Sequence, residues 1–204
     1  RMSYACPCLE LSISRQPLIL FIDYSWESGT ITGKDKINIQ QQGATIMKET
    51  KTNVMRILEK EKIDYEAKFY PHGKEAVDGV TVAELTGQNP EQVFKTLVTV
   101  SNKKEYFVFV IPVAEELDLK KAAKAVGAKS VEMIHVKDIN KVTGYIRGGC
   151  SPVGMKKAYR TTYHETAKEQ PVIMVSAGKI GAQIACAPGD LVRITDGQYA
   201  DVCK

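Results

Sequence analysis

Hydrophobic positions recur at helical spacing soon after position 46. Val54, Ile57 and Leu58 occupy positions i, i+3 and i+4, which lie on one face of an α-helix. The first of these residues follows a polar stretch, and the last is followed by a charged one. The spacing therefore predicts an amphipathic helix over residues 48–62.

Two further elements are indicated by capping residues. Thr81 is followed three positions later by Glu84, the capping-box arrangement in which each side chain satisfies a free backbone N–H group. We expect a helix from Thr81 to Gly87. Asn89 followed by Pro90 then places an N-cap before a proline at the first helical position.

A helix in the middle of the chain has both a cap and an apolar face. Asp118 is a suitable N-cap, and Gly127 is a suitable stop. Further short helices are expected over residues 136–142 and from Pro188. The buried face of the helix after Asp118 is expected to contain Leu119, Ala122, Ala123 and Val126.

Runs rich in β-branched and aromatic residues predict the strands. Residues 94–100 and 106–112 are separated by five polar residues, which indicates a hairpin. Helices and hairpins are mixed without a repeating βαβ rhythm, so we expect an α/β (mixed α+β) fold with a mostly antiparallel sheet and helices packed outside. Tyr70, which ends the first strand, is a candidate cleft residue. The other strands are expected over residues 65–70, 172–176, 182–187 and 199–203.

The length fits one domain with an appendage or one large domain, and the composition is that of a globular protein. The 204 residues are 44% hydrophobic and 25% charged, with a formal net charge of +4. This charge permits an anionic partner without demanding one, because the lysine doublets are scattered. Residues 18–22 form the longest apolar run near the start and are too short to cross a bilayer, so no membrane association is expected.

The first 46 residues differ from the rest. They carry equal numbers of acidic and basic residues, end in a glutamine-rich stretch and show no periodicity. We expect residues 1–46 to be a disordered or non-native extension, with Met47 as a candidate start, and residues 47–204 to form the folded domain. The five cysteines are odd in number and irregularly spaced, which predicts reduced thiols in the cytoplasm rather than a disulfide framework.

Lys95 interrupts an apolar strand and is the first candidate for chemistry. Alternate residues of a strand share a face, so Lys95 lies with Leu97 while Phe94 and Val98 lie opposite. Both faces look buried, and an ammonium there should meet a carboxylate or open into a cleft. The alternative is a lysine on an edge strand, with its methylene groups buried and its ammonium exposed to solvent.

A glycine-rich loop over residues 148–154 is the second candidate. Gly149 and Gly154 have the separation found in phosphate-binding P-loops, but Lys156 is followed by Lys157 where a hydroxyl residue is required, which excludes a nucleoside triphosphatase. Its backbone N–H groups could hold an ester carbonyl or a terminal ribose. The alternative is a purely structural turn.

The nucleophilic residues of the loop lack a diagnostic partner. Cys150 and Ser151 would each need a base, and the three histidines, His72, His135 and His164, have no diagnostic spacing. A small buried cysteine is the commoner outcome. The histidines also lack nearby metal-ligand partners, so no metal and no cofactor is expected.

Taken together, six segments of the chain resemble the YbaK/EbsC family of freestanding aminoacyl-tRNA deacylases, which are related to the editing domain of bacterial prolyl-tRNA synthetases. The resemblance covers residues 48–203 and leaves residues 1–46 without a counterpart. It departs from the family pattern at Cys150, where an aliphatic residue is usual, and at Ala177, where glycine is usual. The six matching segments are residues 94–97, 117–124, 131–133, 144–154, 176–179 and 187–191.

The resemblance implies one domain with a curved, barrel-like sheet ringed by helices. It implies a cytoplasmic enzyme that removes cysteine from mischarged tRNA(Pro), and also from Cys-tRNA(Cys). The 3′ end of an aminoacylated tRNA would be its ligand, and prolyl-tRNA synthetase is a candidate partner. The family's catalytic lysine corresponds to Lys95. The substrate-binding residues implied are Tyr70, Thr96, Gly148, Gly149, Ser151, Pro152, Gly154, Ser176 and Gly178.

The resemblance also implies that the thiol of the substrate attacks its own carbonyl and leaves as a thiolactone. Lys95 would then orient the tRNA 3′ end, and backbone amides near Gly148, Gly149 and Gly154 would hold the carbonyl oxygen. Two alternatives stay open on the residues themselves. One is a module that binds charged tRNA or a synthetase without catalysis, and the other is a hydrolase that uses Cys150 as its nucleophile.

Overall fold

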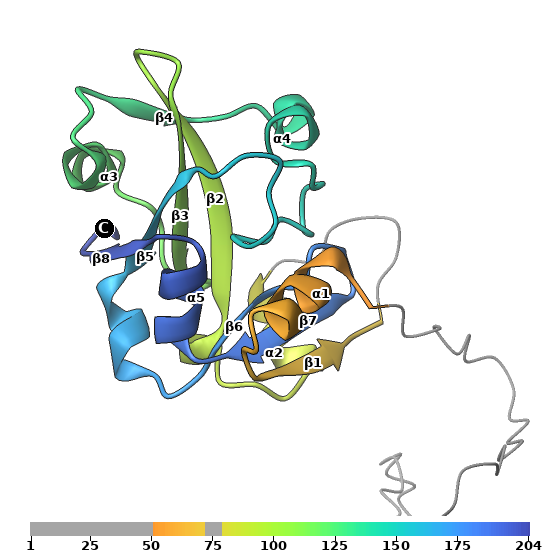
Figure 1. The fold of residues 1–204 in the computed structure, drawn as a ribbon. Helices are drawn as coiled ribbons and strands as arrows, with labels where there is room; N and C mark the ends of the chain where they lie inside the picture. The colour runs from red at the N-terminus through yellow and green to blue at the C-terminus, as the bar shows by residue number, and fades with distance from the viewer. Residues whose placement is uncertain (1–50, 72–78) are drawn as a thin grey trace, which may run out of the picture. The chain divides into compact units, whose positions relative to one another are not determined.

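A computed structural model describes residues 51–71 and 79–204 (Figure 1). The extension expected over residues 1–46 and His72 therefore lie outside the described residues. The helices are α1 (Asn53–Lys60), α2 (Gly79–Leu85), α3 (Leu119–Val126), α4 (Val136–Thr143) and α5 (Pro188–Ile194), with 3-10 turns η1 (Pro90–Gln92) and η2 (Glu165–Glu169). The strands are β1 (Tyr65–Phe69), β2 (Phe94–Ser101), β3 (Tyr106–Pro112), β4 (Val131–Met133), β5 (Arg160–His164), β6 (Ile173–Ser176), β7 (Ala182–Cys186) and β8 (Gln198–Ala200).

The strands form two sheets, with the order β4-β2-β3-β5-β8 in the larger and β1-β7-β6 in the smaller. All neighbours are antiparallel except β3–β5 and β5–β8, which are parallel. An isolated bridge between Val93 and Met174 joins the two sheets. The mixed, mostly antiparallel α+β class is confirmed, whereas the single barrel-like sheet is not, because the described strands divide into two sheets.

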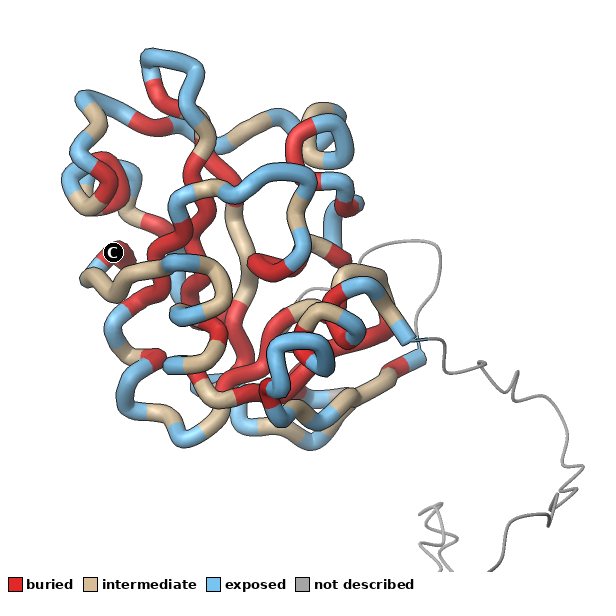
Figure 2. Tube along the Cα trace, in the orientation of Figure 1, coloured by how far each residue is buried: buried red, intermediate tan, exposed pale blue. Residues whose placement is uncertain are grey.

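The larger sheet has a buried core on each of its faces. Phe107, Phe109 and Ile111 alternate along β3 and pack against α3. Val108 and Val110 point to the opposite face, toward the core that also contains Leu58 of α1 and Val142 of α4. Figure 1 shows α3 and α4 on opposite sides of β2 and β3, and Figure 2 shows the buried residues concentrated along these central strands.

The helix signals around residues 89–90 and 118–127 are confirmed. The Asp118 carboxylate accepts hydrogen bonds from the amides of Lys120 and Lys121 at 2.8 and 3.1 Å. The Asn89 side-chain oxygen accepts one from the Glu91 amide at 3.1 Å, although the turn that follows is 3-10 rather than α-helical. These caps satisfy donors that have no partner inside a first turn, which is why they mark helix starts so reliably.

Two expectations for the helices are wrong. The helix α2 begins at Gly79, so Thr81 is its third residue and the capping box with Glu84 does not form the start. Leu119 is 40% exposed and does not belong to the buried face of α3. In the first turn of a helix, a side chain can lie beyond the edge of the sheet on which the later turns pack.

The strands β4 and β5 were not expected. The β5 sequence carries polar residues, yet four of its five residues are buried because it lies between β3 and β8. Its hydroxyls find partners, since Thr161 donates to the Tyr159 carbonyl at 3.0 Å and Thr162 accepts from Gln198 at 3.3 Å. In the described part of the chain, no helix has the length and apolar character to cross a membrane.

Candidate functional site

A cavity of about 470 Å³ lies along the edge of β2. The strand β4 pairs with the last three residues of β2, and the Ile134 amide donates to the Val98 carbonyl at 3.2 Å, so this edge is open only before Val98 among the described residues. The polar or glycine residues on the cavity wall are Tyr70, Gly79, Lys95, Thr96, Arg147, Gly148, Cys150, Ser176 and Gln183. The apolar residues are Val82, Val93, Phe94, Leu97, Val98, Val113, Met133, Ile134, Val136 and Ile139.

The register of the hairpin turns the backbone of Thr96 toward the cavity. The Val113 amide donates to the Val93 carbonyl at 2.9 Å, and the Ser101 amide donates to the Glu105 carbonyl at 2.8 Å. The odd-numbered residues of β2 therefore make their backbone hydrogen bonds to β3, whereas the backbone N–H and C=O groups of Thr96 point to the other edge of the strand. The Thr96 hydroxyl is also buried and has no hydrogen-bond partner among the described residues.

Lys95 lies on the cavity wall with its ammonium held in place. Its Nζ donates a hydrogen bond to the Val113 carbonyl oxygen at 2.9 Å, and the residue is half-buried. The ion pairs between described residues do not include it. Of the two expectations for a buried ammonium, the cleft matches this position. No described carboxylate forms an ion pair with Lys95, although the pKa of Glu116 is lowered chiefly by its hydrogen bond with Lys204 and, to a smaller extent, by the charge of Lys95.

Tyr70, which directly follows β1, and Ser176, which ends β6, also line the cavity. The Tyr70 amide donates to the Gly181 carbonyl at 3.0 Å, and burial raises the pKa of the Tyr70 phenol, which therefore stays protonated at neutral pH. The Ser176 hydroxyl oxygen accepts from the Gly178 amide at 3.3 Å and keeps its own hydrogen to donate.

Gln183 is a cavity residue that the sequence did not reveal. It lies on β7, is only 6% exposed, and its side-chain oxygen has no hydrogen-bond partner among the described residues. A buried amide oxygen without a partner is costly, so it is a candidate acceptor for a ligand group. A lone glutamine in an otherwise apolar strand was the only available signal.

A turn presents the first half of the glycine loop to the cavity. The Gly149 amide donates to the Ile146 carbonyl at 3.0 Å, and Gly148 has φ +80°, as a type II turn requires at its third position. Arg147 and Gly148, at the corner of the turn, line the cavity. The Gly149 amide is thus engaged within the turn, which removes it from the expected set of donors to a substrate carbonyl.

The other residues of the expected binding set do not lie on the wall of this cavity. Ser151 is fully buried, and its hydroxyl accepts from the Val153 amide at 3.3 Å. Pro152 and Gly154 line a second cavity of about 270 Å³. Gly178 packs tightly, since a Cβ there would lie 3.0 Å from a ring carbon of Tyr145. These positions indicate roles in shaping the loop.

Cys150 lines the cavity without being activated. Burial raises the pKa of its thiol to about 11, so the thiol is protonated at neutral pH. His164 accepts from the Val202 amide at 3.3 Å, and His135 precedes α4; neither lines the cavity. Among the described residues, no three His, Cys, Asp or Glu side chains gather in a group that could hold a metal ion.

Comparison with known proteins identifies the family. Residues 74–194 match the sequence model of the aminoacyl-tRNA editing domain. The chain is 49% identical over 152 residues to EbsC of Enterococcus faecalis, a protein assigned by name as a Cys-tRNA(Pro)/Cys-tRNA(Cys) deacylase. This alignment covers 74% of the present chain and 93% of EbsC.

Two solved structures share the fold. One is described as a trans-editing enzyme for prolyl-tRNA synthetase, with a TM-score of 0.62, 24% identity and coverage of 69% of this chain and 87% of its own. The other is the hypothetical protein APE2540, with a TM-score of 0.67, 20% identity and coverage of 74% and 99%. The resemblance carried by the six sequence segments is confirmed, and the chain belongs to the aminoacyl-tRNA editing domain family.

Proposed function

We propose that this protein is a trans-editing deacylase that removes cysteine from mischarged tRNA(Pro) and from Cys-tRNA(Cys). Its membership of the editing-domain family and the name given to EbsC support this activity. The observation that carries the proposal is the presence of Lys95 and Gly148 on the wall of one cavity. The proposed substrate implies a cytoplasmic location, makes prolyl-tRNA synthetase a candidate partner, and assigns the activity to residues 47–204.

The cavity suits a small aminoacyl ester. Its volume of about 470 Å³ is within the range of small-molecule sites, and buried apolar residues such as Val93 and Phe94 form part of its wall. Lys95, fixed by the Val113 carbonyl, would orient the negatively charged 3′ end of the tRNA. The donors proposed for the substrate carbonyl oxygen are the backbone amide of Gly148 and the backbone amide and hydroxyl of Thr96.

The proposed chemistry uses the substrate's own thiol. Its sulfur forms a bond to the carbonyl carbon, and the bond from that carbon to the ribose oxygen breaks. The proton lost by the thiol balances the proton gained by the ribose oxygen, so the products are a cysteine thiolactone and the free tRNA. The protein supplies orientation and stabilises the developing charge, which is typically worth ~3 kcal/mol per hydrogen-bond donor.

Replacement of Lys95 tests the assignment. Lys95→Ala should lower kcat/KM for Cys-tRNA(Pro) by about a hundredfold or more, because a positioned charged donor is lost. Lys68→Ala is the matched control, since Lys68 also lies on a strand, does not line the cavity and forms an ion pair with the exposed Glu66 at 3.2 Å. Deacylation of Cys-tRNA(Pro) by purified protein provides the measurement. Unchanged turnover by Lys95→Ala would contradict the assignment.

A second substrate separates the proposed chemistry from its alternatives. tRNA(Pro) charged with S-methylcysteine has no free thiol, so the thiolactone route predicts that its ester survives. The ester of tRNA(Pro) charged with serine should also survive, because a hydroxyl group is a weaker nucleophile than a thiol. Hydrolysis of all three esters would favour attack by water. If the wild-type protein binds Cys-tRNA(Pro) and leaves it intact, the module that binds without catalysis is the correct function.

A further inference from the structure

Two exposed apolar side chains line the cavity, and a third belongs to the residue before Arg147, which also lines it. Among the described residues, five large hydrophobic side chains are exposed. Met133 and Val136 are 45% and 57% exposed and line the cavity, and Ile146 is 52% exposed and precedes the cavity residue Arg147. The other two are Val80 and Leu119. Clustered exposed apolar residues usually mark a binding surface.

The exposure of these residues places them at the mouth. Other wall residues, such as Val93, Phe94 and Gln183, are at most 6% exposed and form the inner part of the cavity. Residues that are half exposed and also line the cavity must stand where it opens to solvent. Met133, Val136 and Arg147 meet this condition, and the exposed Ile146 directly precedes Arg147 in the chain. We call these four residues the mouth rim.

The rim lies in a cationic stretch of the domain. Residues 133–157 contain five Lys or Arg residues and one Asp, so this segment carries a formal charge of +4, as much as the whole chain. Arg147 stands at the corner of the turn that the Gly149 amide and the Ile146 carbonyl close. The rim therefore combines apolar surface, a planar guanidinium and a positive field, the combination that suits an unpaired nucleobase with its phosphates.

We propose that the mouth rim stacks the terminal nucleobase of the charged tRNA. This inference rests on the proposed function and extends it from the ester to the nucleoside beyond it. With the aminoacyl group between Lys95 and Gly148, the ribose lies toward the opening, and the base, an adenine in every tRNA, lies on Met133, Val136 and Ile146. Arg147 continues the stacking surface and faces the phosphates that lead to the base.

Binding of two stable substrate analogues tests the rim. The first is 3′-amino-3′-deoxyadenosine carrying cysteine in an amide bond, and the second is the same compound with hydrogen in place of the adenine. The double variant Met133→Ser, Val136→Ser should weaken binding of the first by about tenfold and leave the second within about twofold. Leu119→Ser is the control, because this leucine is similarly exposed and does not line the cavity.

Binding by calorimetry needs no turnover, so its outcome is separate from that of the deacylation assay. Equal weakening with both analogues would overturn the inference, since the rim would then only shape the cavity. The inference would also be overturned if the double variant bound both analogues as tightly as the wild type does. The same holds if the wild type bound the two analogues with equal affinity. If the double variant changes the oligomeric state, or affects deacylation only when prolyl-tRNA synthetase is added, the rim is a protein contact and the inference is wrong.

Discussion

Cys150 shows how burial decides the reactivity of a single residue. Its thiol lies on the wall of the cavity, where a nucleophile would be useful. Burial raises the pKa of this thiol to about 11, so the thiol is protonated at pH 7. A thiol becomes a nucleophile only as the thiolate, and neither His135 nor His164 lines the cavity to act as its base.

We predict that Cys150→Ala keeps its activity. Deacylation of Cys-tRNA(Pro) should stay within about twofold of wild type, because the protein thiol takes no part in the reaction. The wild-type rate should rise as pH increases toward about 8.5, where a cysteine thiol ionises, and the variant should show the same rise because that thiol belongs to the substrate. A pH–rate profile of both proteins provides the measurement. A large loss of rate in the variant would favour a thiol hydrolase.

Gln183 carries an unsatisfied buried group that points to a ligand. Its side-chain oxygen lacks a partner among the described residues, and the residue lines the cavity. Gln88 offers a comparison, since both of its side-chain polar atoms are buried without such a partner, but it does not line the cavity. An unsatisfied polar group that serves binding costs stability in the free protein.

We predict opposite effects of Gln183→Met on stability and on activity. Loss of the unsatisfied amide should raise the free energy of unfolding by about 1 kcal/mol, since methionine has a similar volume and no polar group to bury. Deacylation should fall because the substrate loses an acceptor. Gln88→Met should be stabilised without loss of activity. Urea denaturation measures the stability of both variants, and deacylation rates measure their activity. Full activity of Gln183→Met would exclude a role of Gln183 in binding.

At the scale of elements, the glycine loop divides into two parts with different tasks. Gly148 brings backbone to the cavity, whereas Gly154 lies at the second cavity against helix α1. Gly154 has φ +74°, and a Cβ there would lie 2.8 Å from Ile57 and 2.9 Å from the Tyr145 hydroxyl. That hydroxyl cannot easily move, since it donates to the Val153 carbonyl at 2.7 Å. The loop therefore needs glycine for packing as well as for conformation.

Gly154→Ala is predicted to destabilise the fold more than Gly127→Ala does. Gly127 has a similar φ of +70°, but a Cβ there would meet nothing within 4 Å. The loss of unfolding free energy in Gly127→Ala therefore comes only from the left-handed backbone conformation. The additional loss in Gly154→Ala should be about 1–3 kcal/mol of unfolding free energy, because a well-packed site is overfilled. Chemical denaturation of both variants measures the difference, and equal losses would show that the packing can relax.

Local signals explain which elements could be predicted. The Asp118 cap and the hairpin depend on residues close in sequence, so the pattern is visible without the fold. The strand β5 could not be found in this way, because its burial arises from neighbours β3 and β8, which are distant in sequence. The start of α2 was misplaced because the capping-box pattern at Thr81 also occurs inside a helix.

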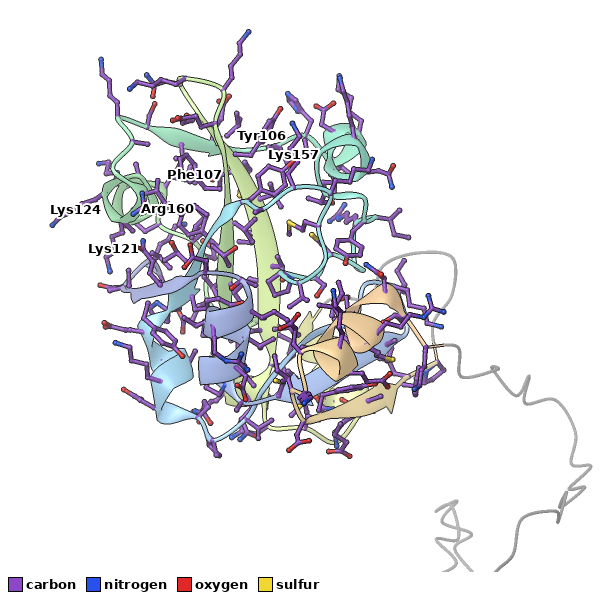
Figure 3. The ribbon with its side chains drawn as sticks, viewed as in Figure 1. Tyr106, Phe107, Lys121, Lys124, Lys157 and Arg160 are labelled. Carbon is purple, nitrogen blue, oxygen red and sulfur yellow. The ribbon has the colours of Figure 1, made fainter. Side chains whose placement is uncertain are left out.

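At the scale of the whole molecule, cationic side chains stand on both sides of the larger sheet. Arg147 stands at the cavity, in the cationic segment 133–157. Lys124 lies on α3, on the other side of β2 and β3, and Figure 3 shows its side chain directed away from the body of the domain. A tRNA whose 3′ end enters the cavity should contact the first of these cations and not the second.

We predict a difference in salt dependence between variants at these two positions. Arg147→Gln should reduce the slope of log affinity against log salt for tRNA by about 0.7, the value for one contact to a single-stranded phosphate. Lys124→Gln should leave the slope unchanged. Binding of uncharged tRNA(Pro) across a series of KCl concentrations provides the measurement. Equal slopes for the wild type and Arg147→Gln would place the phosphates elsewhere.

The sequence by itself determined the family, the class of fold and the lysine at the centre of the proposed site, because these depend on motifs and local periodicity. The tertiary structure decided which residues share the cavity. It brought Tyr70, Lys95, Gly148 and Gln183 together from separate elements, and it turned Gly154 to a different cavity. The physical reason is that strand pairing and packing between distant segments set the position and accessibility of a side chain, and neither is encoded within a short stretch of chain.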